Sequence, residues 1–125
     1  MNVADYIIEL DKEWSFTYKY NDDASLTHTW LDGTYLLYPG SQQSHKAWLN
    51  KAHSEWTKGN KTIIMITKAS NNCSYFNNLV VNQAIIKQVP GNLIYNNYKK
   101  RCKPMILAIY EKKEPIQKSF LVSFD

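Results

Sequence analysis

Few residues of this chain combine side-chain types and spacings that could do chemistry. Ser41 and Ser44 lie just before His45, which suggests a nucleophile and a base. They are too close in sequence for a typical triad, and the chain has no G-x-S-x-G turn. A helix cap followed by a surface histidine explains this stretch better. Asp22 and Asp23 are adjacent carboxylates with no third ligand in view, so a solvated turn is expected there rather than a metal pair.

The cysteines and histidines do not suggest a metal or a disulfide framework. Cys73 and Cys102 are a single pair, and the acidic N-terminal segment lacks the apolar core of an export signal. We therefore expect a reducing compartment, the cytoplasm of a host cell, with free buried thiols. His28, His45 and His53 have no metal-site spacing with each other or with the cysteines, so no metal is expected.

Cations and aromatic rings alternate in one segment of the C-terminal half. The residues concerned are Tyr95, Tyr98, Lys99, Lys100, Arg101 and Lys103. The formal charge of +4 is divided unevenly, with −3 over residues 1–60 and +7 over residues 61–125. This pattern fits either a nucleic-acid surface, which binds through phosphates and stacking, or a plain exposed loop. The basic balance argues against an acidic mimic of DNA.

The elements that must position these residues alternate between strand and helix. The hydrophobic patterns predict strands at 34–38, 62–67, 84–89 and 105–110, a short strand at 92–95, an edge strand at 119–124, and helices at 44–58 and 73–83. The N-terminal 40 residues are less regular. The chain is 125 residues long and 44% hydrophobic, with no apolar run long enough for a membrane span. These features predict one compact α/β domain over 1–125, a mostly parallel sheet with helices on both faces.

The helix at 44–58 carries apolar residues at helical spacing. Trp48 and Trp56 could stack on bases, but this spacing favours core positions for both. Lys51 and Glu55 are four residues apart and are expected to form an exposed ion pair. An open parallel sheet has its site at the carboxyl ends of its strands, so the loop at 38–41 is where chemistry is expected.

The order of motifs resembles one family. LDKEWSFTY is followed by a Trp-x-x-Gly-Thr run at Trp30–Thr34, then by a strand that ends in a proline loop. The helix AWLNKAHSEWTKG, the strand KTIIMIT, the unit AIIKQVPGNLIY and the strand KPMILAIY come next. This arrangement is similar to that of phage-type DNA adenine-N6 methyltransferases, over most of residues 7–110. The resemblance implies a shortened, Rossmann-type methyltransferase fold.

The resemblance also implies a catalytic loop, from which this chain departs. In the family the loop reads Asn-Pro-Pro-Tyr, or begins with Asp. Its amide or carboxylate and its first proline carbonyl accept hydrogen bonds from the adenine amino group, and its aromatic ring stacks on the flipped base. The matching positions here are Tyr38, Pro39, Gly40 and Ser41. Only Pro39 is retained, so we expect this degenerate loop to have lost methyl transfer.

The match to the cofactor-binding part of the family is incomplete as well. The family has an acidic segment after its early aromatic strand that helps to bind S-adenosylmethionine. Here Asp22 and Asp23 precede Ala24 in a shifted position, and no glycine-rich loop exists. We expect no cofactor, with S-adenosylmethionine as the cofactor if the chain is an enzyme.

Three functions remain open from the sequence. The first is a degenerate methyltransferase-like phage protein that binds DNA or a host DNA-handling protein, for example in an anti-restriction or anti-CRISPR role. The second is an active adenine methyltransferase with an altered loop. The third is a structural or interaction subunit of a larger complex, suggested by nine tyrosines and four tryptophans.

Overall fold

A computed structural model describes residues 1–40, 42–70, 73–91, 93 and 105–113. These residues form three α-helices, one short 3-10 helix and five strands. In chain order the elements are α1 (Val3–Trp14), β1 (Tyr18–Tyr20), η1 (Asp23–Thr27), β2 (Gly33–Leu37), α2 (His45–Thr57), β3 (Lys61–Lys68), α3 (Ser74–Leu79), β4 (Ile85–Gln88) and β5 (Met105–Tyr110).

The five strands form one mixed sheet in the order β1-β2-β3-β5-β4. Strands β1, β2 and β3 pair in parallel, whereas β5 is antiparallel to both β3 and β4. Four strands therefore share one direction, and β5 runs against them between two of these. The prediction of a mostly parallel sheet needs this correction. Parallel pairing requires a crossover connection, and the sequence between β4 and β5 has no helical pattern to supply one.

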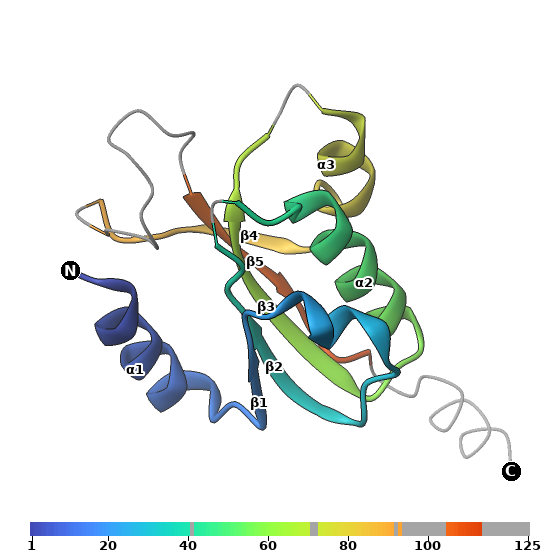
Figure 1. Cartoon of the computed structure of the whole chain (residues 1–125), viewed down its shortest axis with the longest axis horizontal. Helices are drawn as coiled ribbons and strands as arrows, with labels where there is room; N and C mark the ends of the chain where they lie inside the picture. The colour runs from blue at the N-terminus through green and yellow to red at the C-terminus, as the bar shows by residue number, and fades with distance from the viewer. Residues whose placement is uncertain (41, 71–72, 92, 94–104, 114–125) are drawn as a thin grey trace, which may run out of the picture.

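Helices cover both faces of the sheet, as predicted. Helix α1 lies on one side, and α2 and α3 lie on the other (Figure 1). On the α1 side, Tyr6 and Leu10 pack against Leu36, Ile64 and Ile66. The larger core on the α2 side contains Trp30, Tyr35, Leu37, Trp48, Leu49, Ala52, Ile63, Met65, Phe76, Val80, Ala108 and Tyr110. The architecture is α/β and is compatible with a Rossmann-like fold.

Strand β3 is the centre of this arrangement. It lies between β2 and β5 and is covered on both faces, so its apolar run is uninterrupted. Because successive side chains of a strand point to opposite faces, Ile63 and Met65 enter the core under α2, while Ile64 and Ile66 enter the core under α1.

Helix α2 begins and ends close to the predicted positions. Ser44 caps its first turn, with the Oγ accepting a hydrogen bond from the Ala47 N–H at 3.2 Å. Gly59 and Asn60 follow with φ values of 84° and 62°, a left-handed backbone that stops the helix. Trp48 is fully buried as predicted, whereas Trp56 is only half-buried.

Helix α1 was not predicted, since the pattern of the N-terminal 40 residues is less regular than that of the rest of the chain. Asn2 caps it by accepting a hydrogen bond from the Asp5 N–H at 2.9 Å. Tyr6 and Leu10 lie on one helical face and are 6% and 5% exposed. The spacing of these two residues, four apart, is what a packed helix requires.

The other predicted elements divide into three groups. The strands at 34–38, 62–67, 84–89 and 105–110 are confirmed within a residue or two. The helix at 73–83 is shorter, at Ser74–Leu79. The strands at 92–95 and 119–124 lie outside the described residues, apart from Leu93, which is not in a strand. In the described part of the chain, no helix is both long and apolar enough to cross a bilayer.

The packing of α1 predicts a difference between two of its residues. Leu10→Ala removes a buried side chain and should lower the free energy of unfolding by about 2–5 kcal/mol. Ile8→Ala changes a side chain that is 57% exposed, and should change the free energy of unfolding by less than about 0.5 kcal/mol. Urea unfolding followed by circular dichroism compares the two variants. Equal effects would show that α1 does not dock on the sheet through Leu10.

Candidate functional site

The loop after β2 occupies the predicted site at the carboxyl ends of the parallel strands, but its first residue faces elsewhere. The N–H of Tyr38 donates to the carbonyl of Tyr20, at 3.0 Å, beyond the end of β1. The ring of Tyr38 packs against the apolar cluster under α1, and Pro39 is buried. Ser41 lies outside the described residues. The aromatic side chain at position 38 is therefore part of the core.

Both backbone polar groups of Gly40 are bonded to side chains at the start of α2. The Gly40 N–H donates to Oε1 of Gln43, and the Gly40 carbonyl accepts from Nε2 of His45 at 3.2 Å. These bonds hold the proline loop against α2.

The side chain of Gln43 also reaches the loop that follows β1. Its Nε2 donates to the carbonyl of Asn21 at 2.9 Å and to Oδ1 of Asp23 at 3.0 Å. The same Asp23 oxygen accepts from the indole N–H of Trp48 at 2.9 Å. Asp22 caps η1 by accepting from the Ala24 N–H at 3.0 Å. Asp22 and Asp23, the candidate cofactor ligands, are thus engaged in holding the chain's own backbone and side chains.

The imidazole of His45 links the loop to the end of β3. Because the Gly40 carbonyl can only accept, Nε2 carries the proton, and Nδ1 accepts from the hydroxyl of Thr67 at 2.9 Å. The side chain of His45 is 4% exposed, so the prediction of a surface histidine is wrong. Burial lowers its pKa to about 4, assisted by the charge of Lys68 and opposed by the bond to Gly40. The ring is therefore neutral at pH 7.

Together these groups form what we name the carboxyl-edge network, consisting of Asn21, Asp23, Gly40, Gln43, His45, Trp48 and Thr67. Its hydrogen bonds join the ends of β1, β2 and β3 to α2. A neutral imidazole bonded at both nitrogens is poorly placed to act as a base. The described residues also contain no group of three histidine, cysteine or acidic side chains that could hold a metal ion.

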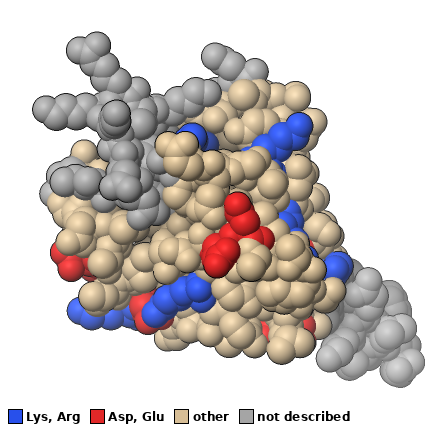
Figure 2. Space-filling model, viewed as in Figure 1, with Lys and Arg blue, Asp and Glu red and all other residues tan. Residues whose placement is uncertain are grey.

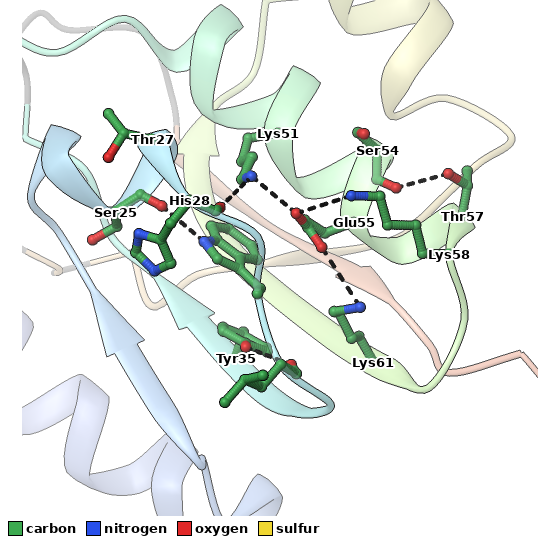
Figure 3. A network of polar contacts seen from close by, with 12 residues as sticks. Ser25, Thr27, His28, Tyr35, Lys51, Ser54, Glu55, Thr57, Lys58 and Lys61 are labelled. Atoms are coloured by element: carbon green, nitrogen blue, oxygen red, sulfur yellow. Dashed lines mark hydrogen bonds and ion pairs between the residues drawn. The ribbon is translucent and has the colours of Figure 1, made fainter.

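A second polar cluster lies deeper under α2 and centres on Glu55. Its carboxylate is fully buried and contacts three ammonium groups, at 2.9 Å from Lys51, 3.4 Å from Lys58 and 3.5 Å from Lys61 (Figure 3). Lys51 also donates to the carbonyl of His28 at 2.6 Å. The predicted pair of Lys51 and Glu55 exists, but the prediction that it is exposed is wrong.

The surroundings of Glu55 keep it ionised. Burial by itself raises the pKa of the carboxyl, but hydrogen bonds from Lys51 and from the backbone of Trp30, with the charges of Lys51 and Lys58, outweigh it. The net effect places the pKa of Glu55 below its usual value. Lys61 is itself 5% exposed by side chain, so the pair of Glu55 and Lys61 is removed from solvent.

Many of the aromatic side chains stack within the protein. Trp30 and Tyr35 are buried and lie 4.8 Å apart in a stacked pair, and Tyr18 stacks on the other side of Tyr35 at the same distance. The ammonium of Lys51 lies 5.5 Å from the centre of the Trp30 ring. The Trp-x-x-Gly-Thr run therefore supplies a packing residue, Trp30. Packing within the protein therefore accounts for part of the aromatic content, and these rings do not require a binding interface.

The predicted binding surface lies outside the described residues: Tyr95, Tyr98, Lys99, Lys100, Arg101 and Lys103. Cys102 is also outside, and the thiol of Cys73 is free but half-buried instead of fully buried. Gln43 and Glu55 were missed as organising residues. Gln43 directly precedes the Ser44 cap, but nothing local in the sequence marks its contacts with Asn21 and Asp23.

No protein-family model matches the chain, and neither a curated protein nor a solved structure matches it. The class that the structure itself defines is a small α/β protein with a five-stranded mixed sheet and three helices in its described part. The resemblance to methyltransferases stays a prediction from the order of motifs.

The burial of His45 predicts loss of stability in weak acid. The unfolded chain binds a proton at this histidine below pH 6.5, whereas the folded chain does so only near pH 4. Stability should therefore fall by about 3 kcal/mol as the pH drops from 7 to 4. Urea unfolding at several pH values measures this, and His45→Gln should flatten the dependence. His53→Gln is the matched control and should leave the slope intact; a slope unchanged in His45→Gln would contradict this assignment.

The Glu55 cluster predicts a second loss of stability, at a lower pH than that of His45. Glu55→Gln leaves the buried ammonium of Lys61 and the largely buried ammonium of Lys51 without a counter-charge and should cost about 3–5 kcal/mol in the free energy of unfolding at pH 7. Because the pKa of Glu55 is lowered by folding, its contribution is present above the usual glutamate range and is lost as the pH falls below it. Urea unfolding at pH 7 and pH 3 tests both statements. The exposed Glu111→Gln is the control, and a similar small effect of both variants would count against the buried ion cluster.

Proposed function

We propose that this protein is a methyltransferase-like phage protein that has lost methyl transfer and acts by binding DNA. The observation that carries the proposal is the double engagement of Gly40 by Gln43 and His45. In the family that the sequence resembles, this loop must offer acceptors to an adenine amino group and a ring to stack on the base. Here the loop is bonded to the protein's own side chains.

Two further features support the loss of catalysis. Tyr38 occupies the position of the acceptor side chain, and its ring packs under α1. Asp23, the better placed of the two acidic candidates, bonds to Gln43 and Trp48. Opening this edge for a cofactor and a flipped base would break several hydrogen bonds, among them the buried bond between His45 and Thr67, which is costly to leave unmade.

The charge of the chain supports DNA as the partner. Residues 61–125 carry a formal charge of +7, which favours phosphate binding through release of counterions. Figure 2 shows that the described lysines on one face are dispersed, with acidic side chains between them, and that these residues do not form one continuous basic patch. Non-specific electrostatic attraction alone would then give weak DNA binding, so we expect a defined binding site that makes several contacts with the DNA.

The test combines binding with methylation. Fluorescence anisotropy with a labelled 20-base-pair duplex and with its single strand, at 50 and 200 mM salt, should show binding that weakens as salt rises. Incubation of either DNA with radiolabelled S-adenosylmethionine should transfer no methyl group, while an active adenine methyltransferase run in parallel does. Methyl transfer to adenine would overturn the loss of catalysis, and no binding of either DNA at 50 mM salt would overturn the DNA part of the proposal.

An extract experiment separates DNA from a host protein as the partner. Affinity capture from the extract of a bacterial host, with and without nuclease, should recover DNA that disappears on nuclease treatment. Recovery of one host DNA-handling protein that resists nuclease would instead replace DNA with a protein partner, as an anti-restriction or anti-CRISPR role requires.

A further inference from the structure

A polar pocket opens at the end of the sheet opposite to the carboxyl-edge network. It has a volume of about 310 Å³ and lies where β2 and β3 begin and β5 ends. We name it the amino-edge pocket, and it is lined by Asp32, Gly33, Thr34, Asn60, Thr62 and Lys112. The side chains of these residues carry a carboxylate, an amide, two hydroxyls and an ammonium. Such a set offers both donors and acceptors to a polar ligand.

The backbone around this pocket has a defined shape. Gly33 has a φ of 150° and donates its N–H to the carbonyl of Asn60 at 3.3 Å. A Cβ at position 33 would come within 3.0 Å of the Thr17 hydroxyl oxygen, so glycine fits here for two reasons. On the other wall, the N–H of Lys112 donates to the hydroxyl of Thr62 at 3.1 Å. These bonds hold the start of β2 and the chain after β5 at either side of the pocket.

An aromatic ring fixes the neighbouring segment. The indole N–H of Trp56 donates to the carbonyl of Glu111 at 2.6 Å, and the ammonium of Lys113 lies 4.4 Å from the centre of the Trp56 ring. The ring packs on Tyr110 at 5.3 Å. The half-buried Trp56 therefore presents a partly accessible ring beside two consecutive lysines, Lys112 and Lys113.

The Glu55 cluster leaves positive charge close to this edge. One carboxylate is matched with three lysines, so two positive charges are uncompensated within the cluster. Lys58 is the member that reaches the surface, with a side chain that is 50% exposed, and it lies two residues before Asn60 of the pocket. Lys112 lines the pocket and Lys113 follows it in the chain, while the acidic Asp32 lines the pocket and Glu111 precedes Lys112.

We propose that the amino edge binds single-stranded DNA, with one unpaired base in the amino-edge pocket and the backbone phosphates on Lys112 and Lys113. The pocket is open to solvent, and its lining residues can receive the edge of a single base. Its donors and acceptors can bond a base edge, which in a duplex is already paired. Release of Lys113 from Trp56 forfeits only about 0.5–1 kcal/mol, after which the ring can stack on a neighbouring base.

This inference rests on the proposed function, because it names the form of DNA and the surface that binds it. The probe is a labelled 20-nucleotide oligo(dT), with a 20-base-pair duplex as the second arm. Lys112→Ala with Lys113→Ala should weaken oligo(dT) binding about tenfold at 50 mM salt. Each lost phosphate contact should also reduce the salt slope by about 0.7. The matched control is Lys46→Ala with Lys87→Ala, which removes the same charge from exposed sites elsewhere and should have a much smaller effect.

A second pair of variants tests the pocket without changing charge. Asn60→Gly removes the amide from the pocket at a position whose φ of 62° suits glycine, and Asn82→Gly does the same at a φ of 65° away from the pocket. Asn60→Gly should weaken oligo(dT) binding several-fold with an unchanged salt slope, and Asn82→Gly should not.

The outcomes separate this inference from the proposed function. Absence of binding by the unchanged protein to either DNA would refute both. Equal weakening by the two lysine pairs, or duplex binding as tight as single-strand binding, would refute the inference and leave DNA binding standing. Loss of binding only in Lys99→Ala with Lys100→Ala and Arg101→Ala would also refute it and would assign binding to the segment at 95–103.

Discussion

The imidazole of His45 is the contact on which the carboxyl edge of the sheet depends. It is buried and neutral, and it joins the Gly40 carbonyl to the Thr67 hydroxyl at the end of β3. Gln43, two residues earlier, connects the same loop to Asp23. Neighbouring residues at the start of α2 thus close the edge at which an open α/β sheet ordinarily binds its ligand. The polar groups that a substrate would use are employed in holding the fold.

The opposite edge is organised by charge rather than by a neutral ring. Glu55 is buried under α2 with three lysines around it, an arrangement that is costly to desolvate and more costly to break. The excess of lysines over carboxylates gives this end of the sheet a positive character, and Trp56 anchors the chain after β5 beside it. The two edges therefore differ in the described residues: one carries the carboxyl-edge network, and the other has the amino-edge pocket with Lys112 in its lining.

Local patterns predicted much of the fold. The apolar run of β3 and the Ser44 cap of α2 depend on neighbours in sequence, so they could be read directly. Helix α1 could also have been found, because Tyr6 and Leu10 have helical spacing after Asn2. The burial of Glu55 and of His45 could not be predicted, since each depends on partners that only the fold brings near. The same holds for the antiparallel direction of β5 and for the position of the pocket. The methyltransferase resemblance predicts a site at the carboxyl edge, where the described residues form the carboxyl-edge network.

The central proposal is that this protein binds its ligand at the amino edge of the sheet and not at the carboxyl edge. Backbone amide NMR of the whole chain, titrated with oligo(dT), measures this residue by residue. The account predicts that the amides of Gly33, Asn60, Thr62, Lys112 and Lys113 shift with the added oligonucleotide, while those of Gly40, Gln43 and His45 stay in place. Shifts centred on Gly40, Gln43 and His45, with the amino edge unchanged, would contradict it.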